Sequence, residues 1–357
     1  MNRSRLLTIN LNLILNEMSE VRRDILTDTW VIVQTETAEV PLDHRTQRKP
    51  PAVCPFDVGN ESQTPPEIFA IRTGNTLPNH PGWQVRVVPN KNPVLRIEGK
   101  LIREGAGIHD KVSGIGANEV IIETPEHIKS LHALSAKQIS LVFKTYQSRI
   151  VDLYQDKRFR YVMVFKDYGA LAGASTIEHS HSQLIALPAT PQQIKTELSG
   201  AKAYFEYKER CIFCDIIANE LEDQSRVILE TNYFVVLAPY ASRFPFELII
   251  FPKRHTFSFE IVTPDEITNI GEVVKRTMQA LYDILFDPPY NYVLHTSPNL
   301  LPHPPKAGYW STIQDDFHWH LEIIPRIKRT DGFEWGSGFF INPVAPETVA
   351  SKLKEKL

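Results

Sequence analysis

The sequence predicts an α+β protein made of two tandem halves, each a mostly antiparallel β-sheet with one packed helix. The chain has 357 residues, which is enough for two domains of about 100–200 residues each. Short apolar runs of strand length alternate with two longer stretches of helical periodicity. A set of short motifs occurs twice in the same order, which indicates an internal duplication. We place the halves at residues 1–200 and 201–357, with the boundary in the polar stretch Gln192–Lys208.

In the first half, the proline-rich segment 41–66 predicts irregular, turn-rich structure. Apolar runs of strand length follow at Trp83–Val88, Glu119–Glu123, Tyr161–Phe165 and Gln183–Leu187. A helix is expected between the second and third of these strands, because Ser135 and Gln138 have the spacing of a capping box. The apolar residues on its predicted buried face are Ile139, Val142, Tyr146, Ile150 and Leu153.

The second half repeats this order of elements. Strand-like runs occur at Tyr233–Leu237, Glu247–Phe251, Asn291–His295 and Leu321–Ile324. Thr263 and Glu266 have the spacing of another capping box, with Pro264 at the first helical position, so a helix is expected to begin there. Its apolar stripe runs from Ile267 to Leu285 with the spacing of a helix that packs on a core.

Three motifs mark each half: a Cys-x-x-Cys or Cys-x-x-Asp element, a strand followed by a histidine, and a His-x-His that opens the last strand. In the first half they read CPFD (54–57), VIIETPEH (120–127) and HSHSQLIALP (179–188). In the second half they read CIFC (211–214), LIIFPKRH (248–255) and HWHLEIIP (318–325). Six landmarks in the same order predict two related folding units.

Composition excludes several classes of protein. Lys and Arg total 39 and Asp and Glu total 42, a net charge of -3, so no broad basic field exists to hold nucleic acid. The longest apolar runs, such as Leu248–Phe251, are far too short to cross a membrane. Three cysteines cannot form a disulfide framework, and the odd count favours a reducing compartment. The stretch Leu6–Leu15 is broken by polar residues and lacks a cleavage site, so we expect a cytoplasmic protein without a signal peptide.

The second half contains a candidate zinc site formed by Cys211, Cys214, His255 and His318. A Cys-x-x-Cys turn supplies two thiolates, and two histidines from distant strands can complete a tetrahedron. The alternative is a chance pair of buried cysteines without a metal. The matching pattern in the other half favours a tightly bound zinc ion.

The corresponding residues of the first half are Cys54, Asp57, His127 and His179. A carboxylate is a legitimate zinc ligand, but it is a harder donor than a thiolate and weakens the hold on a soft metal. We therefore expect a second zinc site that is weaker or empty. The alternative is a degenerate site that packs without metal.

The segment around His181 is a candidate reaction centre. On a strand, alternate residues face the same way, so His179, His181 and Gln183 share one face. A neutral histidine can act as a nucleophile toward phosphorus. The small-residue loop 166–175 precedes it, and such loops let backbone N–H groups and a hydroxyl approach phosphate oxygens. The alternative is a pair of core histidines beside an ordinary turn.

The segments GASTIEHSHSQLIALP, FHWHLEIIPR and DGFEWGSGFFINPVAPE resemble the galactose-1-phosphate uridylyltransferases. These enzymes form the branch of the histidine-triad superfamily whose subunit carries two triad-like halves. The resemblance covers most of the chain, from about Arg22 to Pro346. It implies two histidine-triad-like halves, the first with the nucleophile and the second with a zinc site and a sugar-binding segment. It also implies a homodimer that acts on a nucleotide sugar and a sugar phosphate.

The resemblance implies a role for each matching residue. His181 would be nucleotidylated through Nε2, with its Nδ1–H donated to the backbone carbonyl of His179, and Gln183 would bind the transferred phosphate. The residues that would bind the remaining parts of the substrates are Lys166, Asp167, Gly173 and Ser175 in the loop, Asn90 for the nucleotide and Glu334 for the sugar hydroxyls. The two metal sites would be the two clusters given above. In other members of the family the second site holds iron and includes a glutamate. We interpret this sequence as lacking that glutamate, so its second site is expected to hold zinc.

Two departures leave the substrate open. His-Ser-His-Ser-Gln stands where the commonest form of the family has His-Pro-His-Gly-Gln, and Asp57 stands for a cysteine. The first reading is a ping-pong enzyme in which His181 takes UMP from UDP-glucose and passes it to galactose 1-phosphate. Because the serine form also resembles a plant-type relative, the alternative is an ADP-glucose phosphorylase. The alternative of another class is a catalytically silent nucleotide- or zinc-binding relative.

Overall fold

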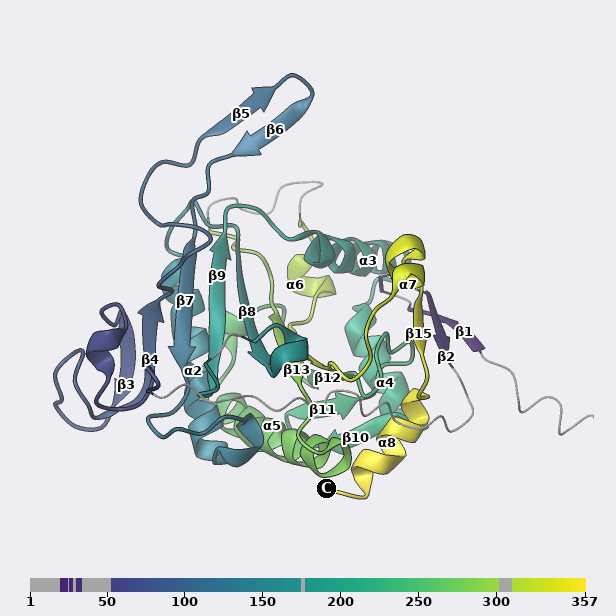
Figure 1. Cartoon of the computed structure of the whole chain (residues 1–357). Helices are drawn as coiled ribbons and strands as arrows, with labels where there is room; N and C mark the ends of the chain where they lie inside the picture. Colours follow the sequence, from purple (N-terminus) through teal and green to yellow (C-terminus); the bar gives the residue numbers. More distant parts are fainter. Residues whose placement is uncertain (1–19, 25, 28–29, 34–52, 175–176, 302–309) are drawn as a thin grey trace, which may run out of the picture.

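The computed structural model describes residues 20–24, 26–27, 30–33, 53–174, 177–301 and 310–357 (Figure 1). Its centre is a ten-stranded antiparallel sheet in the order β10-β11-β12-β14-β13-β8-β9-β7-β4-β3. The first half contributes β3 (Phe69–Arg72), β4 (Trp83–Pro89), β7 (Ala117–Ile122), β8 (Tyr161–Tyr168) and β9 (His181–Leu187). The second half contributes β10 (Val227–Glu230), β11 (Phe234–Leu237), β12 (Leu248–Pro252), β13 (Tyr290–His295) and β14 (His320–Pro325).

The α+β prediction with mostly antiparallel sheets is confirmed, and the two sheets are joined into one. The connection is the antiparallel pairing of β8 with β13, in which Lys166 is opposite Tyr292. The predicted strands are all present, with ends that differ by one or a few residues. Strands β3 and β10, at the two edges, were not predicted, and neither was the hairpin of β5 (Arg103–Ala106) and β6 (His109–Val112), which projects from the molecule (Figure 1).

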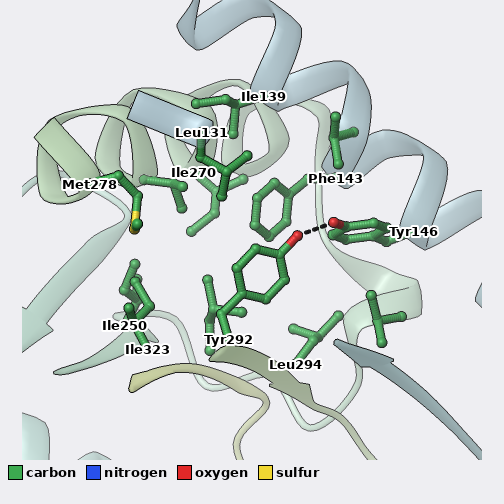
Figure 2. Packing of buried hydrophobic residues seen from close by; sticks show 14 of the residues in the cluster. Leu131, Ile139, Phe143, Tyr146, Ile250, Ile270, Met278, Tyr292, Leu294 and Ile323 are labelled. Carbon is green, nitrogen blue, oxygen red and sulfur yellow. Dashed lines mark hydrogen bonds between the residues drawn. The ribbon is translucent and has the colours of Figure 1, made fainter. Parts of the chain in front are cut away.

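The two long helices lie side by side on one face of the sheet and enclose the main core with it. They are α2 (Ala136–Leu153) and α5 (Pro264–Leu285). At Gly271 of α5 the helices approach so closely that an added Cβ would lie 2.1 Å from Ser140 Oγ, so only glycine fits there. In Figure 2 the core side chains of both halves interdigitate, and the hydroxyl groups of Tyr146 and Tyr292 meet within it.

The helix starts test the two capping predictions. Thr263 and Glu266 make both reciprocal bonds of the capping box at α5, as predicted. At α2, Ser135 accepts from the Gln138 backbone as expected, but the amide group of Gln138 donates instead to the carbonyls of Gln84 and Glu123. The second bond of that box is therefore absent, because the side chain ties the helix to neighbouring strands.

The polar stretch predicted to separate the halves is helix α3 (Gln192–Lys208). With α4 (Ile212–Asp223) it packs on the face of the sheet opposite α5, where its buried residues include Ile194 and Leu198. The chain continues through α6 (Ile313–Asp316), α7 (Gly332–Ser337) and α8 (Pro346–Lys354). A small sheet combines β1 (Glu20–Arg23), β2 (Trp30–Val33) and β15 (Phe340–Asn342), with β2 and β15 parallel.

The described ranges also contain four short 3-10 helices: η1 (Glu61–Gln63), η2 (Leu131–Ala133), η3 (Ala170–Ala172) and η4 (Phe259–Ile261). The predicted irregular segment 41–66 is described only from residue 53, where it consists of turns and η1, and the stretch Leu6–Leu15 lies outside the described residues. Among the helices of the described ranges, none has the length and apolar character needed to cross a bilayer.

Candidate active site

His181 is the first residue of β9 and lines a cavity of about 240 Å³. Its Nδ1 lies 2.7 Å from the backbone oxygen of His179, which confirms the contact that the resemblance implied. Donation of Nδ1–H to that carbonyl fixes the tautomer and leaves the lone pair on Nε2. The ring also packs edge-on against Phe56, with 5.3 Å between centroids, so its orientation is held from two sides.

The surroundings keep His181 uncharged. Burial and the nearby ammonium group of Lys166 lower the pKa of His181 to about 4. At neutral pH the ring is therefore neutral, which is the form in which an imidazole nitrogen can attack phosphorus.

Gln183 and Asn90, predicted to contact the phosphate and the nucleotide, lie near each other in the structure. Asn90 follows β4, and its Nδ2 lies 3.5 Å from Gln183 Oε1. Gln183 is two residues after His181 on β9, so both side chains leave the same face of the strand. Neither side chain is fully buried, so both can reach a ligand beside His181.

The small-residue loop forms the turn η3 above this cavity. Gly169 has a φ of 84° and packs so closely on Pro289 that an added Cβ would lie 2.5 Å from it. The backbone N–H groups of Ala172, Gly173 and Ala174 donate to carbonyls within the loop. Gly173 thus has an internal partner for its N–H, and Ser175 lies outside the described residues. Their contacts with substrate remain predictions.

Asp167 and Lys166, predicted to bind substrate, have different surroundings. Asp167 lines the cavity, and its Oδ1 accepts from Asn291 Nδ2 of the second half at 2.6 Å. Lys166 is buried, and its ammonium group donates to the carbonyl oxygen of His181 at 2.9 Å. Its position indicates that Lys166 supports the strand that carries the nucleophile.

A buried ion pair lies directly beneath that strand. Lys166 Nζ is 2.7 Å from Glu123 Oε2, and at most 1% of either side chain is exposed. The hydroxyl group of Ser180 donates to the same carboxylate at 2.5 Å and accepts from Lys166 at 3.0 Å. Burial raises the pKa of a carboxyl group, but Lys166 lowers the pKa of Glu123 below its ordinary value, which favours the carboxylate; burial in turn lowers the pKa of Lys166, and Glu123 opposes that shift.

The second serine of the motif joins the same network. Ser182 Oγ accepts from the hydroxyl of Tyr146 at 2.8 Å, and that hydroxyl also lies 3.3 Å from Glu123 Oε1. Both serines alternate with His181 and Gln183 along the strand and so point to its other side, and Ser180 is also part of the cavity lining. This accounts physically for the His-Ser-His-Ser-Gln form, because both hydroxyl groups are used in a buried polar network.

Replacing Lys166 by methionine is expected to destabilise the protein by about 3–5 kcal/mol, because Glu123 would remain as a buried, unpaired charge. Turnover should fall as well, since the carbonyl of His181 loses its donor. The double variant Lys166→Met, Glu123→Gln should recover much of the lost stability in urea unfolding. A double variant no more stable than Lys166→Met would contradict the importance of the ion pair.

The predicted metal ligands of the second half are assembled from three separate segments. Cys214 Sγ lies 3.4 Å from His255 Nδ1 and 3.9 Å from His318 Nδ1, and Cys211 Sγ lies 3.7 Å from His318 Nδ1. Tetrahedral zinc with bonds of about 2.3 Å to sulfur and 2.0 Å to nitrogen would place these atoms about 3.5 Å apart. The donor set therefore fits zinc.

The groups around this cluster also favour a metal. His255 Nε2 lies 2.9 Å from the Gln314 carbonyl and His318 Nε2 lies 3.0 Å from the Arg254 carbonyl, which leaves each Nδ1 free to bind. Hydrogen bonding with Cys211 and the two histidines lowers the pKa of the Cys214 thiol. A thiolate is the form that binds zinc.

The four predicted ligands of the first half also meet, with all ligand atoms within 4.8 Å of one another. Asp57 Oδ1 lies 2.6 Å from His127 Nδ1 and 3.0 Å from His179 Nδ1, and Cys54 Sγ lies 3.8 Å from His179. His127 and Asp57 are about one third exposed, so this cluster is more open to water than the other. The residues fit a metal, with one hard ligand and a wetter environment.

Glu334, predicted to hold sugar hydroxyls, lies on α7 beside β15, on the side of the molecule away from β9 (Figure 1). Its Oε1 accepts from Lys328 at 2.7 Å, and the side chain completes a capping box with Asp331. The structure does not bring Glu334 to His181 within one chain, so its contact with sugar stays a prediction.

A third cluster was missed by the sequence analysis: Glu197, His295, His320 and Glu322, all buried and able to hold a metal ion. His295 Nδ1 lies 3.0 Å from Glu197 Oε2. Burial alone would lower the pKa of His295, but Glu197 and Glu322 raise it. The expectation that no glutamate accompanies the second His-x-His is therefore wrong. Glu197 escaped notice because it lies 98 residues from its partner, in a stretch interpreted as a linker.

Comparison with known proteins identifies the same architecture elsewhere. The family model for the galactose-1-phosphate uridyl transferase N-terminal domain matches residues 12–191, and that of a domain of unknown function, DUF4921, matches residues 121–357. An ADP-glucose phosphorylase of Arabidopsis thaliana is 35% identical over 95% of this chain and 93% of the relative. A galactose-1-phosphate uridylyltransferase of Thermotoga maritima is 29% identical over 95% of this chain and 98% of the relative.

Solved structures agree with these matches. The crystal structure of ADP-glucose phosphorylase from Arabidopsis thaliana with bound ADP-glucose superimposes with a TM-score of 0.77 at 33% identity, covering 95% of this chain and 98% of the other. The duplicated sheet with a His-x-His in each half defines a two-half member of the histidine-triad superfamily. The chain belongs to the galactose-1-phosphate uridylyltransferase family. Nucleotidyl transfer is the activity that this membership supports.

Proposed function

We propose that the protein transfers a nucleotidyl group from a nucleotide sugar through a covalent intermediate on His181. The observation that carries this proposal is the neutral His181 ring, which lines a cavity and has its Nδ1 bonded to the His179 carbonyl, so that Nε2 keeps its lone pair. Nε2 attacks the α-phosphorus, a P–N bond forms, and the bond to the sugar phosphate oxygen breaks, releasing sugar 1-phosphate. An oxygen of the acceptor phosphate then attacks the same phosphorus, and the P–N bond breaks.

Two donor and acceptor pairs are candidates. The first is UDP-glucose with galactose 1-phosphate, the activity named for the Thermotoga maritima relative. The second is ADP-glucose with inorganic phosphate, which the higher identity to the Arabidopsis thaliana ADP-glucose phosphorylase favours. The roles of Ser180 and Ser182 fit either pair, because both hydroxyl groups are bonded within the buried network.

The deciding experiment is incubation with UDP-glucose and ADP-glucose separately, followed by intact mass measurement. A mass increase equal to UMP or to AMP, mapped to His181, would identify the nucleobase and the nucleophile together. A protein that takes up neither group would contradict the proposed function and would favour a silent nucleotide- or zinc-binding relative.

Replacing Gln183 by alanine is expected to lower kcat on the order of 100-fold with little change in KM. The amide is a neutral donor aimed at the phosphoryl oxygens, where charge develops in the transition state, and donors of this kind contribute mostly there. Steady-state kinetics with the identified donor measures both constants. An unchanged kcat with a raised KM would mark Gln183 as a ground-state contact only.

We further propose that zinc occupies the second-half cluster tightly and the first-half cluster weakly, in a homodimer that works in the reducing cytoplasm. When bound in the first half, the ion would fix the backbone of His179, whose carbonyl orients His181. The softer and less exposed ligand set of the second half supports the difference in affinity. Light scattering on the purified protein would test the dimer.

Metal analysis should therefore reveal unequal sites. Mild chelation is expected to remove at most one metal ion per chain and to lower activity without unfolding, and Asp57→Cys should raise the metal content toward two per chain. Two zinc ions in the unaltered protein that leave together under chelator would show instead that Asp57 is a fully competent ligand.

A further inference from the structure

The second His-x-His motif reproduces the local geometry of the first. His320 is the first residue of β14, and its Nδ1 lies 3.1 Å from the His318 carbonyl, as His181 Nδ1 does from His179. Phe213 packs on the His320 ring with 5.7 Å between centroids, in the place that Phe56 takes beside His181. Each half therefore presents a histidine with the same tautomer beside a phenylalanine.

The strands beside the two histidines also correspond. In the first half, Gln183 is paired across β7 and β4 with Val120 and Val88. In the second half, Glu322 is paired across β12 and β11 with Ile249 and Leu237. The strand residues beside Gln183 in the first half thus correspond in register to those beside Glu322 in the second.

A cavity of about 760 Å³ lies against this second wall, within the range of about 300–1,000 Å³ that is usual for ligand pockets. Its apolar side is built by Phe213, Ile216, Leu237, Ile249 and Phe251, with Tyr240 also in the lining. Aromatic and branched side chains of this kind suit a flat heterocyclic ring.

The floor of this cavity differs from the first-half site in charge. Glu322 stands where Gln183 stands in the first half, and Glu197 Oε2 lies 3.9 Å from His320 Nε2. Arg243 pairs with Glu322 at 2.8 Å and His295 with Glu197 at 3.0 Å, but the cavity lining as a whole holds more carboxylates than arginines, so it repels a phosphate. Hydroxyl groups, in contrast, can donate to carboxylates, and the bond of His320 Nδ1 to the His318 carbonyl leaves Nε2 as an acceptor.

We propose that the second half holds a non-catalytic pocket for an uncharged nucleoside, with the base on the apolar wall and the ribose hydroxyls donating to Glu322 and His320. The choice of a nucleoside rests on the proposed function, because it follows from the correspondence with the nucleotide wall of the first half. The exclusion of phosphate rests on the excess of carboxylates over arginines in the cavity lining.

The test is equilibrium dialysis of labelled adenosine and uridine against the full-length protein, with saturating nucleotide sugar present to occupy the first-half site. One of the two nucleosides is expected to remain bound at one per chain. Ile216→Trp, which fills the cavity from α4, and Glu322→Gln should each weaken this binding at least 10-fold. Melting temperatures establish that both variants are folded, and Glu322→Gln covers the case in which Ile216→Trp does not fold.

The control is Asn90→Ala, which alters the first-half site and should leave the retained binding unchanged. Loss of binding in Asn90→Ala would overturn the proposal, because it would place the nucleoside in the first half. Equal binding in Ile216→Trp and the unaltered protein would overturn it as well, as would AMP or UMP binding as tightly as the nucleoside. None of these outcomes depends on an adduct at His181. The adduct measurement therefore tests the proposed reaction independently of the nucleoside pocket.

Discussion

Replacing His181 by alanine is expected to reduce turnover on the order of 10⁴-fold or more while the protein stays folded. Alanine removes Nε2, the atom that forms the P–N bond in the proposed mechanism. The ring is partly exposed and its one hydrogen bond is local, so its loss should change the melting temperature little.

The matched control for this variant is His80→Ala, because His80 is an exposed histidine whose Nδ1 lies near the Pro78 carbonyl and away from the cavity. Turnover with the identified donor and intact mass after incubation are measured for both variants. The control should retain turnover and adduct formation. If His181→Ala still formed the adduct, or turned over at a near-normal rate, another residue would be the nucleophile.

Replacing Cys214 by serine is expected to lower the melting temperature by about 5 °C, which for a chain of this size corresponds to about 4 kcal/mol. The second-half cluster joins the turn before α4, the segment after β12 and the segment before β14, so loss of zinc would release three separated parts of the fold. A serine hydroxyl is a poor zinc ligand compared with a thiolate, so the replacement removes the metal as well as one bond.

The matched control for Cys214→Ser is Cys54→Ser in the first half. That cluster already contains a carboxylate and is more exposed, so its metal should contribute less to stability. Scanning calorimetry with metal analysis on the same samples separates the two effects. A Cys214→Ser variant that melts like the unaltered protein, or an unaltered protein without zinc, would show that the cluster is not a stabilising metal site.

Local patterns explain the parts of the fold that could be predicted. The start of α5 follows from the capping box at Thr263 and from Pro264, both of which act within one turn of helix. The central strands follow from short apolar runs that are buried on both faces, such as the β12 run Leu248–Pro252. The two sets of candidate metal ligands could be predicted because each motif occurs in both halves of the chain. Such a repeated pattern rarely arises by chance.

Other parts of the site depend on distant partners and carry no local signal. Gln192–Lys208 looks like a linker because it is polar, yet it is a helix that buries Glu197 against His295. Lys166 follows a strand and precedes a small-residue loop, which suggested a phosphate contact. Its partner Glu123, 43 residues earlier, draws the ammonium group into the core.

The sequence by itself predicted the duplication, the class of the fold, the candidate nucleophile His181 and two sets of candidate metal ligands, because these predictions depend on residue types at fixed spacing. Only the tertiary structure decided that the two halves share one sheet, since the β8–β13 pairing uses backbone groups that every residue possesses. It also decided that the serines of His-Ser-His-Ser-Gln lie in a buried network and that Glu322 replaces Gln183 in the second half. Whether a side chain is buried, and which charges surround it, depends on residues from distant parts of the chain. The spacing of residues in the sequence does not show which of them come together.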